Sequence, residues 1–240
     1  MAKSEAEFHD TDLIPWTKIE GVNAHEKILS KDPDTGDYTR IIMSQPDMDE
    51  SIRDYYNPKS KMLVHDIWEE VFIWKGSIID TSLDQTFVDG FYACRPPGME
   101  HGPLFHPNGC TSIEFRYGGK HNKPELEFFD TRLLPWEKVE GAHGIYQKIL
   151  SKDPVSGNIT RLVKSLPDMD ESIRDYYNPK SKVLVHDFWE EVIILRGTII
   201  CTTLNQTFGK GFFACRPPGM KHGPLFHPSG CLSLECRYYK

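Results

Sequence analysis

The sequence has 240 residues, of which 39% are hydrophobic and 26% are charged, and its formal net charge is −7. These values describe a globular chain long enough for one large or two ordinary domains. They argue against a nucleic-acid partner, because the charge is negative and no Lys/Arg block stands out, and no apolar run approaches the ~20 residues that span a bilayer. The first residues lack the apolar stretch of a signal peptide, so we expect a cytoplasmic protein with no membrane partner.

The two halves of the sequence repeat each other. Residues Asp10–Trp16 return as Asp130–Trp136, and the block Pro46–Lys61 returns unchanged as Pro167–Lys182. A repeat of this length is too long for a solenoid and indicates a duplicated domain. We therefore expect one domain at residues 1–120 and a second at 121–240, with the turn-rich stretch Gly118–Pro124 as the linker.

Within each copy the local signals are short β-strands. In the first copy, Tyr38–Met43 follows a turn at Asp32–Gly36, Met62–His65 and Val71–Trp74 form a second pair, and Ile113–Tyr117 closes the domain. Short strands at ~8–12-residue spacing with Gly and Pro between them favour a β-sandwich or barrel. No stretch has the pattern of a long amphipathic helix.

Two histidines and a glutamate recur with the same spacing in both copies. His65 lies four residues before Glu69, and His101 follows a sharp turn at Pro96–Gly98 that aims it back toward them. The second copy repeats the set as His186, Glu190 and His222. Imidazole and carboxylate are ligands for zinc, iron, nickel and manganese, and three protein ligands leave positions open for chemistry. Both sets are therefore candidate metal sites.

These stretches resemble the two sequence motifs of the cupin superfamily. Gly90–His101 and Gly211–His222 have the second motif, G-x5-P-x-G-x2-H, in full. His65–Gly76 and His186–Gly197 have the first motif, H-x-H-x(3,4)-E-x6-G, apart from its first histidine. That position is occupied by Leu63 and Leu184.

The resemblance covers nearly the whole chain and is to the branch of anti-sigma-factor cupins and of diketone- and acetophenone-cleaving dioxygenases. It implies an all-β fold of two tandem cupin domains (double-stranded β-helix, jelly roll), a bicupin with a metal inside each domain. The remaining two-histidine, one-carboxylate set suits non-haem Fe(II), and Zn(II), Mn(II) and Ni(II) stay open.

Two more histidines lie near the expected ligands. His106 and His227 each lie five residues beyond the last ligand of their copy, after a Gly-Pro turn that can place the ring over the barrel mouth. We expect them to act as acid/base groups, with metal ligation as the alternative. The acidic-aromatic block Asp47–Tyr56, with a turn or two of helix, is either a lid or a solvated loop.

Neighbouring side chains have plainer interpretations. Glu70 follows a ligand, so strand alternation predicts that it faces outward. Arg95 is expected in a surface ion pair, with anion binding open, Trp68 in packing, and Glu114 in an ion pair with Arg116. Their repeat counterparts carry the same expectations: Glu191, Arg216, Trp189, Glu235 and Arg237. The six cysteines lack zinc-finger or C-x-x-C spacing, so we expect buried thiols.

Two classes of function fit these residues. The first is a metal-dependent enzyme, led by an Fe(II) dioxygenase that cleaves a C–C bond in a small enolisable or aromatic carbonyl compound, with a redox-neutral Zn or Mn lyase, decarboxylase or isomerase as its alternative. The second is a zinc-holding sensor or ligand-binding cupin without turnover. The expected partner is a small-molecule substrate, and a homodimer is open.

Overall fold

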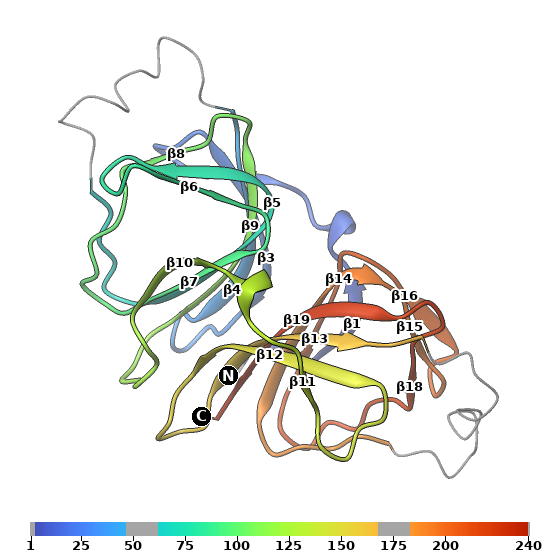
Figure 1. The fold of residues 1–240 in the computed structure, drawn as a ribbon. Coiled ribbons are helices and arrows are strands. Elements are labelled where there is room, and N and C mark those ends of the chain that lie inside the picture. Colours follow the sequence, from blue (N-terminus) through green and yellow to red (C-terminus); the bar gives the residue numbers. More distant parts are fainter. Residues whose placement is uncertain (1–2, 47–61, 168–182, 240) are drawn as a thin grey trace. The chain divides into compact units, whose positions relative to one another are not determined.

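The structure, a computed structural model, describes residues 3–46, 62–167 and 183–239 (Figure 1). Within these ranges the regular structure is β-strand apart from two one-turn 3-10 helices, Thr11–Leu13 and Thr131–Leu133. The expected all-β fold is confirmed, and no helix of the described ranges is long and apolar enough to cross a membrane. The expectations for Asp47–Tyr56 lie outside the described residues.

The chain divides into two compact units, and the first contains Ile14–Leu133. Its main sheet has the order β10-β7-β5-β9-β4-β3-β2, and β6 and β8 pair with the far half of β5. The strands are β2 (Thr17–Lys18), β3 (Ala24–Lys31), β4 (Tyr38–Ser44), β5 (Trp68–Asp80), β6 (Gln85–Val88), β7 (Phe91–Arg95), β8 (Leu104–Phe105), β9 (Cys110–Tyr117) and β10 (Leu126–Asp130). Met62–His65, expected as a strand, is instead a loop with one isolated β-bridge, which joins Leu63 to His101.

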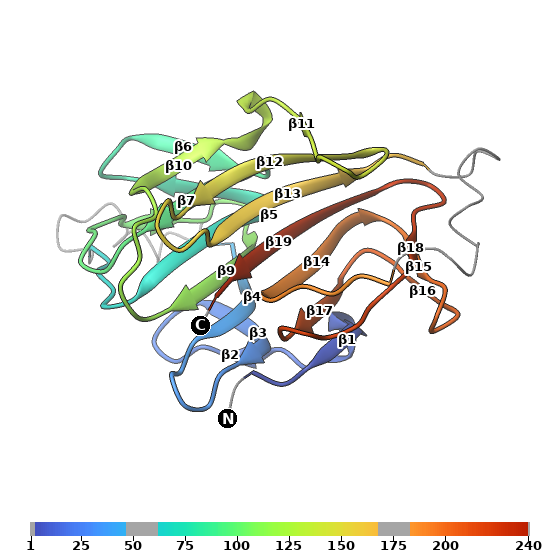
Figure 2. The ribbon, with the colours of Figure 1, turned by 90° about the horizontal axis from the view of Figure 1, so that it is seen from below.

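The second unit contains Lys3–Leu13 and Leu134 onward. Its main sheet has the order β1-β17-β14-β19-β13-β12-β11, and a small sheet has the order β16-β15-β18. Figure 2 shows β1, β17 and β14 side by side in this sheet. The strands are β1 (Ala6–Asp10), β11 (Glu137–Lys138), β12 (Ile145–Lys152), β13 (Ile159–Ser165), β14 (Trp189–Gly197), β15 (Ile199–Cys201), β16 (Gln206–Phe208), β17 (Phe212–Arg216), β18 (Leu225–Phe226) and β19 (Cys231–Tyr238).

One glycine in each unit lies where the chain leaves the main sheet and goes on to pair with the short strands, β6 and β8 in the first unit and β16 and β18 in the second. Gly76 has φ of 93°, and a Cβ there would collide with the carbonyl oxygen of Gly109. Gly197 has φ of 85° and stands in the same relation to Gly230. A side chain fits neither position, which explains the fixed glycine that ends the first motif.

An apolar core fills the space inside each unit. In the first it includes Val71, Ile73, Ile78 and Phe87, and in the second their counterparts Val192, Ile194, Ile199 and Phe208. All six cysteines are buried thiols, as expected. Burial, together with Glu114, raises the pKa of Cys110 to about 12, so this thiol stays neutral and packs as a small hydrophobe.

The first strand of each repeat completes the sheet of the other repeat. β1 pairs antiparallel with β17, with Ala6 opposite Cys215, and β10 pairs in the same way with β7, with Leu126 opposite Cys94. The compact units therefore differ from halves at 1–120 and 121–240 by one exchanged strand at each end. The expected linker Gly118–Pro124 lies inside the first unit.

This exchange predicts how fragments behave. A fragment of residues 1–120 lacks β10 with Phe128 of the core, and it carries β1 without β17. We expect it to aggregate or to dimerise through β1, whereas residues 14–133 should be monomeric and fold cooperatively. Size-exclusion chromatography and thermal unfolding of both fragments test this. A monomeric 1–120 fragment as stable as 14–133 would show that β10 is not needed to complete the unit.

Candidate metal centres

Backbone contacts place the two histidines of each unit. In the first unit, Leu63 N–H donates to His101 O at 2.9 Å, and His101 N–H donates to Leu63 O at 3.1 Å. Gly98 N–H, in the turn after β7, donates to His65 O at 2.8 Å. Glu69 is the second residue of β5. The same contacts recur in the second unit among Leu184, His222, Gly219 and His186.

The three expected ligands of each unit come together. His65 Nε2 lies 3.5 Å from Glu69 Oε1, and His101 Nε2 lies 3.5 Å from Glu69 Oε2. The candidate ligand atoms of the set all lie within 4.8 Å of one another. The leucine at the missing motif position, Leu63, is 37% exposed and brings no donor atom.

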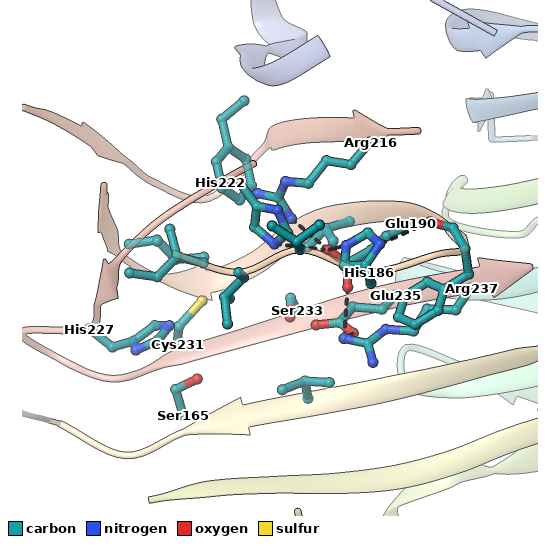
Figure 3. Close-up of a pocket in the computed structure, with 18 residues that line it drawn as sticks. Ser165, His186, Glu190, Arg216, His222, His227, Cys231, Ser233, Glu235 and Arg237 are labelled. Carbon is teal, nitrogen blue, oxygen red and sulfur yellow. Dashed lines mark hydrogen bonds and ion pairs between the residues drawn. The ribbon is translucent and has the colours of Figure 1, made fainter. Parts of the chain in front are cut away.

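The second unit has the same cluster (Figure 3). His186 Nε2 and His222 Nε2 lie 3.5 and 3.8 Å from Glu190 Oε2. Among the described residues, His186 Nε2 is a buried nitrogen with no hydrogen-bond partner. A buried nitrogen lone pair that faces a carboxylate is energetically costly unless a cation lies between the two groups. The cluster therefore fits a divalent metal.

The imidazoles of His65, His101 and His222 are suited to metal ligation because they favour the neutral form. Burial lowers the pKa of His101 and His222, and the guanidiniums of Arg95 and Arg216 lower it further. Burial likewise lowers the pKa of His65. Nδ1 of His101 and of His222 face the carbonyl oxygens two residues back, at 3.3 and 3.4 Å. These contacts hold the proton on Nδ1 and leave Nε2 free as a donor to metal.

Two arginines share each central carboxylate, which sequence reasoning missed. Arg95 donates to Glu69 Oε2 at 2.9 Å, and Arg116 donates to Glu69 Oε1. In the second unit Arg216 and Arg237 lie 2.8 and 2.7 Å from Glu190. The expected surface ion pair of Arg95 and Arg216 is therefore wrong: both side chains are buried, because the last residue of β7 or β17 faces inward beside the glutamate of the central strand.

In the second unit the arginines help to keep the central carboxylate charged. Burial opposes ionisation of Glu190, but His186, Arg237 and Arg216 together hold its pKa well below the usual range. The ion pair of Glu114 with Arg116 is confirmed at 2.9 Å, and that of Glu235 with Arg237 at 3.3 Å. The second unit thus presents an ionised oxygen donor whose charge is partly balanced by arginine.

Glu70 and Glu191 are buried, which corrects the expectation that they point to solvent. Glu70 is fully buried, accepts hydrogen bonds from Tyr92 and Tyr117 hydroxyls, and pairs with Lys123 Nζ at 2.5 Å. Glu191 pairs with Lys3 Nζ at 2.5 Å in the same way. Strand alternation does turn both away from the candidate ligands, but the segments that carry β10 and β1 cover that face.

The tryptophans have the expected packing role. Trp68 is buried and stacks on Tyr117 with ring centroids 6.3 Å apart, and Trp189 stacks on Tyr238 at 6.2 Å. Neither belongs to the lining of the cavity in the second unit.

A cavity of about 290 Å³ opens onto the second cluster. His227 is buried and lines it together with His186, Glu190 and His222. Its repeat counterpart His106 is half-buried. Within the described residues, neither belongs to the clusters of candidate ligand atoms. Their expected acid/base role stays a prediction.

No protein-family model matches the sequence, and no curated protein matches it either. Solved structures do match. A candidate dioxygenase from Nostoc punctiforme has a TM-score of 0.72 at 17% identity, over 98% of this chain and 82% of that one. A cupin 2 conserved barrel domain protein from Leptotrichia buccalis has a TM-score of 0.60 at 13% identity, over 98% of both chains.

A third match is HEPD from Streptomyces albus, solved with 2-hydroxyethylphosphonate and Fe(II) bound. It has a TM-score of 0.66 at 9% identity, over 99% of this chain and 76% of that one. At these identities the likeness concerns the fold alone. The fold is therefore that of tandem cupin jelly rolls, as the motifs implied.

Proposed function

We propose that the chain is a metal-dependent enzyme, and within that class a non-haem Fe(II) dioxygenase that cleaves a C–C bond in a small enolisable or aromatic carbonyl compound. The observation that carries the proposal is the two-histidine, one-glutamate cluster of each unit, in which the second unit has a carboxylate held ionised and a His222 imidazole whose lowered pKa favours the neutral form. This donor set suits Fe(II) and leaves positions open for ligands.

His186, Glu190 and His222 would hold the metal in the second unit. An iron ion held there would supply redox chemistry with O2 and Lewis acidity toward a carbonyl oxygen. Arg216 and Arg237 keep Glu190 ionised and fix both of its oxygens. The protein's own contribution is thus a rigid, charge-balanced set of donors.

The cavity wall supports a small and partly apolar substrate. Phe8, Val192, Ile199 and Leu225 line one part of it and would exclude water around a hydrocarbon or aromatic group. A volume of about 290 Å³ limits the substrate to a small molecule. A ring nitrogen of His227 would take the proton from the carbon beside the carbonyl, which gives the enolate form.

The neighbouring folds add limited support. The Nostoc punctiforme protein is a candidate dioxygenase, and HEPD is seen with Fe(II) and its substrate. They share only 17% and 9% sequence identity with this chain, so the choice of iron and of carbonyl substrates rests on the donor set and the cavity.

The test is O2 consumption by protein reconstituted anaerobically with Fe(II) and offered 1,3-diketones and acetophenones. We expect uptake with at least one of them, and a rate lower by ~10²–10⁴-fold in the double variant His106→Ala with His227→Ala, because each histidine serves its own unit. The double variant should keep its metal. His143→Ala, at an exposed position, serves as the matched control and should behave as wild type.

Two outcomes would contradict the proposal. Zinc retained through purification without O2 uptake by the iron-loaded protein favours the redox-neutral enzyme or the binding protein. Loss of metal in His227→Ala makes this histidine a ligand and removes its role in proton transfer.

A further inference from the structure

We propose that the two metal centres are unequal, and that Phe188 makes the second one the tighter by positioning His186; this rests on the proposed metal function. The repeat provides an internal comparison. Eighteen residues line the cavity around the second cluster, and their counterparts in the first repeat differ at two positions. Phe188 corresponds to Ile67, and Val163 corresponds to Ile42.

Phe188 holds the ring of His186 in two ways. The two rings are stacked, with centroids 4.2 Å apart and planes 2° apart. The carbonyl oxygen of Phe188 faces His186 Nδ1 at 2.9 Å, so Nδ1–H donates to it and Nε2 carries the lone pair. The guanidinium of Arg237, which also binds Glu190, lies over the same phenyl ring at 5.0 Å. Phe188 therefore links the orientation of a histidine ligand to that of the carboxylate.

The first unit lacks this arrangement. Ile67 has no ring to stack on His65, and within the described residues His65 Nδ1 has no corresponding hydrogen bond. The side chain of His65 is 26% exposed, against 11% for His186. His65 therefore has more rotational freedom to lose when it binds a metal, which weakens binding.

One difference acts in the opposite direction. Arg40 pairs with Glu26 at 2.8 Å in the first unit, whereas Arg161 donates to the neutral Gln147 in the second. The negative charge of Glu26, which the second unit lacks, favours the binding of a metal cation in the first unit. Glu26 is 24% exposed, and Arg40, Glu114 and Arg116 separate it from Glu69, so solvent weakens its effect. Positioning by Phe188 is therefore the larger influence.

The test isolates each site in the full chain. His101→Ala leaves the second site, and His222→Ala leaves the first. Calorimetric titration with Zn(II) and the visible spectrum of Co(II) report affinity and geometry in each, without any enzyme activity. We expect the second site to bind ~10-fold more tightly or better, and Phe188→Ile to remove about this factor. Phe188→Tyr, which keeps the ring, should retain it.

The reciprocal change separates positioning from general stability. Ile67→Phe in the first unit should raise the affinity of that site for metal several-fold. This gain does not depend on a change in the thermal unfolding of the metal-free protein. Equal affinities of the two wild-type sites would overturn the inference and leave the metal function standing, and so would Ile67→Phe without a gain. Absence of binding by both sites would remove the metal function itself. Glu26→Gln, which makes the outer charge equal in both units, should change the ratio of affinities little.

Discussion

Replacement of Lys123 by methionine is expected to lower the free energy of unfolding of the first unit by about 3–5 kcal/mol. Lys123 is buried, and its Nζ lies 2.5 Å from a carboxylate oxygen of the fully buried Glu70. Without the ammonium group, Glu70 keeps the hydrogen bonds from Tyr92 and Tyr117 but loses its counter-charge. An unpaired charge in the interior is far more costly than the loss of a surface ion pair.

Urea unfolding followed by hydrogen exchange in peptides from β5 and β14 would measure the effect in each unit. The double variant Lys123→Met with Glu70→Gln should recover much of the loss, because it removes both charges. Lys3→Met is the matched change in the second unit, where Lys3 pairs with Glu191. An effect of Lys123→Met below about 1 kcal/mol, within the range of an exposed pair, would contradict the buried pairing.

Removal of one histidine ligand is expected to abolish metal binding in its own unit. His101→Ala should lower the affinity of the first site by more than the ~10–100-fold typical of losing an outer partner, because a direct donor is lost, and His222→Ala should do the same to the second. Each variant should also lose the stabilisation by bound metal, about 2.7 kcal/mol at a metal concentration 100 times Kd, in that unit only.

Metal titrations monitored by unit-specific unfolding would measure both effects. Wild-type binding should weaken as the pH falls below ~6.5, because protons then compete for imidazoles that burial keeps neutral at higher pH. Loss of metal from both units after one substitution would contradict the independence of the two clusters.

Much of the fold and the clustering of the candidate ligands could be predicted from the sequence. Glu69 and His65 are close in the chain, and the turn at Pro96–Gly98 returns His101 to them, so their meeting depends on local geometry. The duplication likewise indicated two similar all-β units. The metal-binding role of these residues stays a prediction.

The strand exchange could not be predicted, because the same strand stands at the start of each repeat. Phe8 and Phe128 occupy the same place in the two cores, so pairing within a repeat or between repeats satisfies one hydrophobic pattern. The burial of Glu70 depends on this exchange, since the covering segment carries β10. The alternation of side chains along β5 predicts on which face of the sheet Glu70 lies, but the tertiary structure determines which residues cover that face.

The arginines were misjudged for a related reason. A charged residue before a Pro-Pro pair is usually exposed, and the sequence does not show that Arg95 lies opposite Glu69 in the paired strands. The register between β5 and β7 makes the ion pair. The register between β5 and β9 places Arg116 opposite Glu69 as well, so two arginines share this carboxylate, which is the feature that most distinguishes these clusters from an isolated set of ligands.

The metal content of protein purified without chelator or added metal tests the central claim most directly. Elemental analysis should find a divalent metal in the wild-type chain, rising to two per chain after loading, one for each cluster. The double variant His101→Ala with His222→Ala should hold none above background after the same loading. Wild-type protein that holds no more metal than the double variant would contradict the assignment of both clusters as metal centres.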